Sequence, residues 1–215
     1  MELKGKKISV LGDSISTFKG ITLDDPNTFY GRVMMEKGGF RGVEDTWWMR
    51  VIAALGAVFE RDNAFAGSCV ADGFGLGRGM SSRPRTGALG DPDAILIFGG
   101  ANDVGFGVSE AQFREAYTLM LSRLRENYPR AAIFCGTLIN GQKVLDSEPY
   151  FMGEKPGKPL EPFSGIIRAC AAAAGAHLVD MAESGLVYDA IDGCHPTAGG
   201  MAQLAALWID AIQNA

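Results

Sequence analysis

The chain has 215 residues, of which 47% are hydrophobic and 21% charged, a composition typical of a globular protein with one sizeable core. Its net charge of -5 argues against nucleic acid and against an acidic membrane surface as partners, because polyanions are repelled on average. No apolar run approaches the roughly 18 residues that are needed to span a membrane. We therefore expect one domain over residues 1–215, and a homo-oligomer is left open as an alternative to a monomer.

The start of the chain carries basic residues without the apolar segment that is typical of an export signal. The four cysteines lack Cys-x-x-Cys spacing, so no zinc or redox motif is indicated. These features predict reduced thiols and a cytoplasmic location, although a chain whose export signal had been removed would look the same.

Strand and helix patterns alternate along the chain. Short apolar runs that end at Gly or polar turns predict strands, and amphipathic spacing with capping residues predicts helices. In chain order we expect a strand at 7–11, a helix at 46–55, strands at 57–66 and 94–98, a helix at 109–128, a strand at 131–138, a helix at 163–174, a strand at 177–181 and a helix at 197–212. This alternation predicts an α/β fold with a parallel sheet covered by helices on both faces.

Two long segments, 17–45 and 140–162, do not fit this minimal layout. Both follow strands, and long loops in a compact domain are usually functional or disordered. Because sites in such sheets lie beyond the carboxyl ends of the strands, both segments should overhang the active site. The pairs Phe29-Tyr30 and Met34-Met35 could form an apolar pocket there, anchor the loop, or pack on a neighbouring subunit.

Ser14 follows the first strand, in the turn Gly12-Asp13-Ser14. A serine in this place can expose its hydroxyl while backbone N–H groups point at a substrate. Alone the tripeptide is equally typical of a structural turn. Asp13 is expected either to contact substrate or to make hydrogen bonds within the turn.

A nucleophilic serine needs a base, and the chain has two histidines. His177 begins a predicted strand, which puts it at the wrong end of the sheet, so we interpret it as structural. His195 lies in Asp192-Gly193-Cys194-His195-Pro196, where Asp192 is spaced to reach the imidazole Nδ1. Cys194 is a weak alternative nucleophile.

Two further turns could supply hydrogen-bond donors for a tetrahedral intermediate. Gly67 follows the second strand, and Asn102 follows the third in Gly100-Ala101-Asn102-Asp103. The Ser14 N–H, the Gly67 N–H and the Asn102 amide each follow the end of a different strand. Together these three donors could form an oxyanion hole.

Together these blocks resemble the SGNH (GDSL-type) hydrolase family, in the family's order and over nearly the whole chain. Gly12-Asp13-Ser14-Ile15-Ser16 looks like its first block, Gly67 its second, Gly100-Ala101-Asn102-Asp103 its third and Asp192-Gly193-Cys194-His195-Pro196 its fifth. The resemblance implies Ser14 as nucleophile, His195 as base and Asp192 as orienting acid. It implies Gly67 and Asn102 as oxyanion donors, and a three-layer α/β/α fold with a five-stranded, flavodoxin-like parallel sheet.

The resulting hypothesis is a serine esterase that hydrolyses small carboxylic esters through an acyl-enzyme, without a metal or organic cofactor. Short acyl groups are preferred, with O-acetylated sugars as a candidate substrate class. Trp47 and Trp48 could line a sugar-binding surface, with core packing as the alternative. An acyltransferase with the same triad, and a non-catalytic binding protein on the same fold, remain as alternatives.

Overall fold

The main sheet of the protein is parallel and five-stranded, as the sequence predicts. The computed structural model describes residues 1–23, 28–143 and 160–215. The main-sheet strands are β1 (Lys7–Gly12), β2 (Val58–Ala64), β3 (Ala94–Phe98), β4 (Ala132–Gly136) and β6 (His177–Val179). Their spatial order is β2-β1-β3-β4-β6, which is the flavodoxin-like order with the chain reversing direction across the sheet at β1 and β3.

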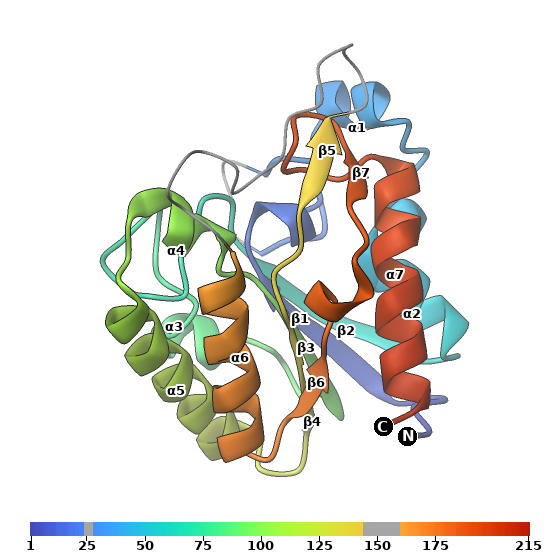
Figure 1. Cartoon of the computed structure of the whole chain (residues 1–215). Coiled ribbons are helices and arrows are strands. Elements are labelled where there is room, and N and C mark those ends of the chain that lie inside the picture. The colour runs from blue at the N-terminus through green and yellow to red at the C-terminus, as the bar shows by residue number, and fades with distance from the viewer. Residues whose placement is uncertain (24–27, 144–159) are drawn as a thin grey trace.

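Helices cover both faces of this sheet and complete a three-layer α/β/α fold (Figure 1). One face carries α2 (Trp47–Ala54) and α7 (Ala198–Gln213). The other carries α3 (Arg83–Thr86), α5 (Glu110–Asn127) and α6 (Glu161–Ala173). The predicted helices and strands are all present, with ends that differ by a few residues.

The two faces of the sheet form two separate hydrophobic clusters. Alternate residues of a strand point to opposite faces, so Ile8 and Val10 pack with Trp208 of α7, whereas Ile95 and Ile97 pack with the residues of α5 and α6. Side-chain caps begin α2, α5 and α7. Ser109 forms a capping box at the start of α5, as the sequence indicates.

Several short elements were not predicted. The segment 17–45 was expected to be a loop, but it contains α1 (Arg32–Gly38) and a short 3₁₀ helix, Val43–Asp45. A second, two-stranded parallel sheet pairs β5 (Gly141–Lys143) with β7 (Tyr188–Ala190), and α4 (Ala101–Phe106) follows β3. Most of the other expected loop, 140–162, lies outside the described residues.

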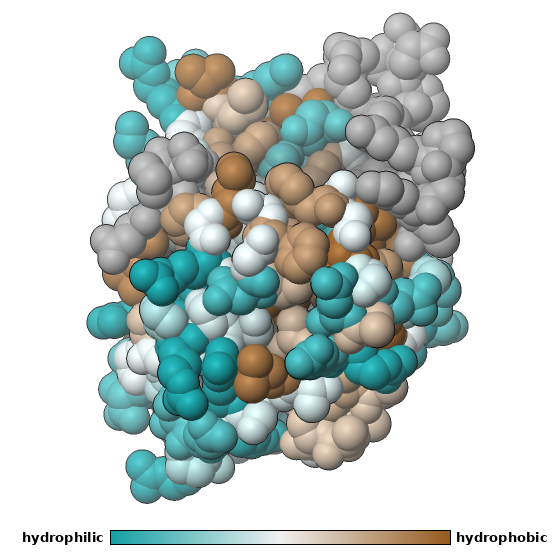
Figure 2. All heavy atoms as spheres, turned by 90° about the vertical axis from the view of Figure 1, so that its left-hand side faces the viewer, coloured by the Kyte–Doolittle hydropathy of each residue, from teal (hydrophilic) through white to brown (hydrophobic). Residues whose placement is uncertain are grey.

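The surface over α3, α4 and α5 is mixed in character. Figure 2 shows hydrophilic side chains over most of its lower half and more hydrophobic ones higher up, toward the carboxyl ends of the strands. Leu76 and Phe106 are each 51% exposed. Among the described helices, none combines the length and the apolar character that a membrane span requires.

Candidate active site

Ser14 lies in a tight turn directly beyond β1. Asp13 caps a short 3₁₀ helix, Ser14–Ser16, by accepting a hydrogen bond from the Ile15 N–H at 3.0 Å. Gly12 allows the turn to fold back closely, since a Cβ there would lie 2.6 Å from the Ser16 Oγ. The turn therefore holds the Ser14 hydroxyl at the carboxyl end of the sheet.

The structure brings Ser14, His195 and Asp192 together in one line of contacts. The His195 Nε2 lies 2.8 Å from the Ser14 Oγ, across 181 positions of sequence. On the other side of the ring, Nδ1 lies 2.8 Å from the Asp192 Oδ2. This is the arrangement in which a carboxylate orients an imidazole and the imidazole receives a serine proton.

Asp192 is also held by the backbone of its own turn. Its Oδ1 accepts from the N–H groups of Cys194 at 3.0 Å and His195 at 2.8 Å. Burial alone would raise the pKa of Asp192, but the hydrogen bonds and charge of His195 outweigh it and lower the pKa to about 2. Asp192 is therefore ionised at any pH near neutrality.

Sheet pairing makes the three predicted donor segments neighbours. Gly12 pairs with Ala64 of β2 on one side and with Phe98 of β3 on the other, so the residues that follow these strands meet at the same edge. Gly67 has φ +77, a left-handed conformation that favours glycine. Within the described part of the chain, no protein acceptor pairs with the backbone N–H of Ser14 or of Gly67.

Two side chains of α4 hold the segment around Gly67. Asn102 donates from Nδ2 to the Ser68 carbonyl at 2.9 Å, which uses one of the two amide hydrogens. Asp103 is fully buried and accepts from the N–H groups of Val70 at 2.8 Å and Ala71 at 3.0 Å. Burial raises the pKa of Asp103 to about 6 in spite of these hydrogen bonds.

Asp13 does not present its carboxylate to a substrate, contrary to one expectation from the sequence. Its side chain is only 3% exposed, because it is used inside the turn. Burial raises the pKa of Asp13 to about 6, although the Ile15 hydrogen bond and the nearby His195 and Arg85 act to lower it. The alternative, a hydrogen-bonding role within the turn, agrees with the structure.

The expectation that Trp47 and Trp48 line a sugar-binding surface is wrong. Both are fully buried beneath the Ser14 turn, where their apolar rings pack into the core. Their indole N–H groups donate to Ser16, that of Trp47 to Oγ at 3.2 Å and that of Trp48 to the carbonyl oxygen at 3.0 Å. They support the turn from below.

Arg85 is a feature of the site that sequence reasoning missed. This buried side chain donates to the carbonyl oxygens of Gly12 at 2.9 Å and Asn63 at 2.7 Å, and to the Ser68 Oγ at 3.1 Å. It therefore connects the carboxyl end of β1 with the end of β2 and with the segment that follows β2. No local pattern around Ser82-Arg83-Pro84-Arg85 signals this role.

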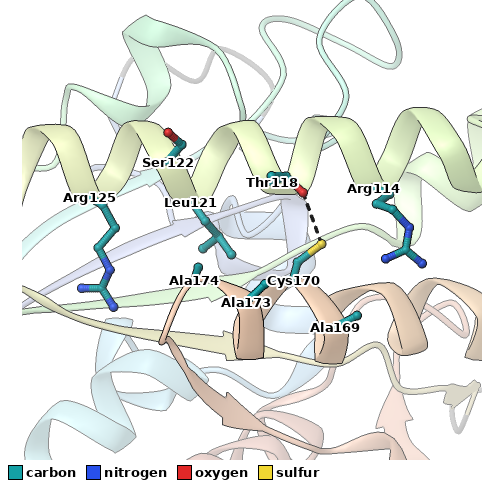
Figure 3. A pocket seen from close by; sticks show the side chains of 9 residues that line it. All are labelled: Arg114, Thr118, Leu121, Ser122, Arg125, Ala169, Cys170, Ala173 and Ala174. Carbon is teal, nitrogen blue, oxygen red and sulfur yellow. Dashed lines mark hydrogen bonds between the residues drawn. The ribbon is translucent and has the colours of Figure 1, made fainter.

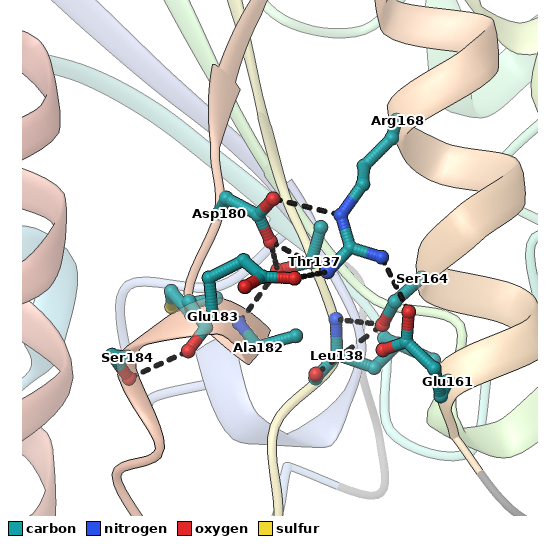
Figure 4. A network of polar contacts seen from close by, with 10 residues as sticks. Thr137, Leu138, Glu161, Ser164, Arg168, Asp180, Ala182, Glu183 and Ser184 are labelled. Atoms are coloured by element: carbon teal, nitrogen blue, oxygen red, sulfur yellow. Dashed lines mark hydrogen bonds and ion pairs between the residues drawn. The ribbon is translucent and has the colours of Figure 1, made fainter.

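Other candidate residues lie elsewhere or have structural partners. His177 begins β6, at the opposite end of the sheet, and stacks on Phe134. Ser14, and not Cys194, has its side chain on the His195 Nε2, and burial raises the pKa of the Cys194 thiol. Figure 4 shows Asp180 bound by Arg168, with Oδ2 2.7 Å from the Arg168 Nε, and by the Thr137 hydroxyl at 3.1 Å.

A cavity of about 370 Å³ lies between α5 and α6, and Figure 3 shows Arg114 and Arg125 at its two ends. Leu121, Ala169, Ala173 and Ala174 are among the residues that line it, and none of the predicted site residues lines it.

Comparison with known proteins identifies the family of the chain. The family model described as "GDSL-like Lipase/Acylhydrolase" matches residues 6–145. A Bacteroides uniformis protein described as a GDSL-like lipase is 26% identical, with a TM-score of 0.75 over 98% of this chain and 97% of the other. A Bacteroides ovatus protein of the same description is 23% identical, with a TM-score of 0.72 over 99% and 100% of the two chains.

A carbohydrate esterase family 2 enzyme from Corynascus thermopiles, solved together with a carbohydrate-binding domain, is 20% identical. Its TM-score is 0.63 over 97% of this chain and 66% of that one, which shows a shared fold. A search of curated proteins gives no significant match.

Proposed function

The chain belongs to the GDSL-like lipase/acylhydrolase family, and from this premise we propose that it hydrolyses small carboxylic esters through an acyl-enzyme on Ser14. The observation that carries the proposal is the pair of 2.8 Å contacts that join Ser14 to His195 and His195 to Asp192. A serine hydroxyl, an imidazole and an ionised carboxylate in this order are the groups that acyl transfer to serine requires.

In the first half of the proposed reaction, the Ser14 Oγ attacks the ester carbonyl carbon and its proton passes to the His195 Nε2. The carbonyl oxygen becomes an oxyanion. The N–H groups of Ser14 and Gly67 and the second amide hydrogen of Asn102 are the donors for it. Collapse of the tetrahedral intermediate breaks the bond to the alcohol oxygen, and His195 gives that oxygen its proton.

In the second half, water takes the place of the alcohol. His195 accepts a proton from water while the water oxygen attacks the acyl carbon, and a second tetrahedral intermediate forms at the same donors. Its collapse breaks the bond to the Ser14 Oγ, which recovers its proton from His195. The products are a carboxylic acid and the free enzyme, and electrons and protons balance without a cofactor.

For the substrate we propose short acyl esters, with O-acetylated sugars as the first class to try. Support for a sugar alcohol comes from the carbohydrate esterases that share the fold, one of which was solved with a bound oligosaccharide as an active-site mutant. The buried positions of Trp47 and Trp48 remove the sequence argument for a tryptophan sugar platform.

The experiment compares wild type with Ser14→Ala, using p-nitrophenyl acetate turnover and labelling by a fluorophosphonate. Ser122→Ala, an exposed serine of α5, is the matched control. We expect Ser14→Ala to lose label and to lose kcat on the order of a millionfold, as for a triad serine. Absence of both label and turnover in wild type, or full activity in Ser14→Ala, would refute the nucleophile assignment.

Acetate release by wild type is then measured with acetylated sugars as substrates, with and without an excess of a second alcohol. Release of acetate independent of that alcohol is expected for a hydrolase. Product that forms only in the presence of the alcohol would identify an acyltransferase instead.

A further inference from the structure

An aromatic ring from the long segment after β1 lies flat against the imidazole of His195. The ring of Phe29 and the His195 ring have centroids 3.4 Å apart and planes inclined by only 9°. The two rings, which lie 166 positions apart in the sequence, are therefore in face-to-face van der Waals contact. Because the edge of the imidazole is occupied by Asp192 and Ser14, the stacked face is where a third contact can act on the ring.

The backbone of Phe29 is tied to the nucleophile turn. Its N–H donates to the Thr17 Oγ1 at 3.1 Å, and the Thr17 hydroxyl in turn donates to the Ser14 carbonyl at 2.9 Å. Phe29, Thr17, Ser14 and His195 therefore form a closed ring of contacts. The position of the Phe29 ring is set by the same turn that sets the Ser14 hydroxyl.

The next residue, Tyr30, fixes Phe29 from the other side. Tyr30 is fully buried, its ring contacts that of Phe29 edge-on with centroids 5.0 Å apart, and its hydroxyl donates to the Pro196 carbonyl at 2.9 Å. Tyr188 of β7 donates to the Cys194 carbonyl at 2.6 Å. The backbone on both sides of His195 is thus held by tyrosine hydroxyls, while its ring is held by Phe29.

Two hydrogen bonds alone leave the imidazole one free movement, a tilt about the line through its two nitrogens. Such a tilt spoils the alignment of Nε2 with the serine hydroxyl, and hydrogen bonding weakens steeply as angles worsen. A flat ring in contact with one face blocks the tilt. The negative face of an aromatic ring also attracts an imidazolium, the form of His195 that exists while it holds the serine proton.

We propose that Phe29 is a positioning residue for His195, which keeps the imidazole plane aligned between Asp192 and Ser14 during proton transfer. The proposal rests on the proposed function, since it needs His195 to act as the base. It gives the segment 17–45 a specific part in the reaction. Phe29 acts through His195 and needs no contact with the substrate.

The test compares Phe29→Leu, which keeps apolar bulk without a ring, with Phe29→Tyr, which keeps the ring. Phe134→Leu is the matched control, because Phe134 in β4 also stacks on a histidine, His177, but at the opposite end of the sheet from the site. For Phe29→Leu we expect kcat to fall roughly tenfold with KM within about twofold, the scale of one aromatic contact. Phe29→Tyr should recover most of the loss, and Phe134→Leu should keep the wild-type kcat.

Four outcomes would overturn the proposal. These are an unchanged kcat in Phe29→Leu, a change in KM alone, no recovery in Phe29→Tyr, or an equal loss in Phe134→Leu. A change in KM alone would make Phe29 a substrate contact. An equal loss in the control would mean that any lost aromatic stacking lowers activity.

A second readout does not depend on turnover. Protons above an aromatic face are shielded, so the His195 ring protons should have upfield chemical shifts in the NMR spectrum of wild type. In Phe29→Leu these chemical shifts should move back downfield. Equal chemical shifts of the His195 ring protons in wild type and Phe29→Leu would show that the two rings do not stack in solution, and would overturn the proposal. Failure of the proposed function is recognised separately, as a wild type that neither labels nor turns over.

Discussion

Arg85 donates a hydrogen bond to the Gly12 carbonyl at 2.9 Å from a side chain that is only 6% exposed. The same guanidinium reaches the Asn63 carbonyl and the Ser68 hydroxyl, so one residue of α3 connects the nucleophile turn with the segment that leads to Gly67. A buried cation with several acceptors is strongly destabilising to remove, because the acceptors are left unpaired in the interior.

We therefore expect Arg85→Met to lower the free energy of unfolding by about 3 kcal/mol and to lower kcat as well. Urea denaturation and ester turnover measure the two effects. Arg83→Met, at an exposed position two residues earlier, should change neither. Equal stability of the two variants would show that the Arg85 hydrogen bonds do not hold the turns together.

Asp192→Asn tests how the imidazole is oriented. The asparagine can keep the Oδ1 contacts with the N–H groups of Cys194 and His195, but its amide nitrogen cannot accept from the Nδ1–H. We expect kcat to fall on the order of 10⁴-fold with little loss of stability. The surface variant Asp210→Asn is the control, and a kcat near that of wild type would exclude Asp192 as the orienting acid.

Asn102→Ala removes a proposed oxyanion donor and the hydrogen bond to the Ser68 carbonyl. We expect kcat to fall about 10²–10³-fold, with a smaller change in KM, because the donor acts on charge that develops in the transition state. Asn214→Ala, at the exposed end of α7, is the comparison. If KM rises while kcat stays the same, Asn102 binds the ground state and is not an oxyanion donor.

Asp13 should make stability depend on pH. Its folded-state pKa of about 6 lies above the ordinary value of 3.8, so the protonated form stabilises the fold. That stabilisation is complete below the ordinary pKa and is lost as the pH rises through about 6.

Asp13→Asn keeps the acceptor for the Ile15 N–H and removes the ionisation. Between about pH 3 and pH 8, we expect wild type to lose roughly 3 kcal/mol relative to this variant, at 1.36 kcal/mol per pKa unit. Denaturation at a series of pH values measures the difference. Parallel curves for the two proteins would contradict a raised pKa.

The sequence predicts those parts of the molecule whose signals are local. The strand Ala94–Phe98 is a continuous apolar run and is buried along its whole length, and the Ser109–Gln112 capping box begins α5 as expected. Asp192 and His195 are predictable because they lie three positions apart in one turn.

What sequence reasoning missed depends on residues far apart in the chain. The sequence alone allows Trp47 to contact a ligand, but in the structure Trp208 stacks on Trp47 with ring centroids 4.8 Å apart. The contact of Phe29 with His195 and the contacts of Arg85 join residues that no periodicity or spacing relates. Short elements such as α4 fall below the length at which helical periodicity can be recognised.

The burial of the tryptophans has an optical consequence. The chain has three, all fully buried, and two of them donate their indole N–H groups to Ser16, two residues from the Ser14 hydroxyl. Two of the three native emitters therefore lie next to the nucleophile turn, and none of the three is exposed to solvent. A red shift of the tryptophan emission would report water entering the buried core that includes the Ser14 turn, in the unlabelled wild-type protein.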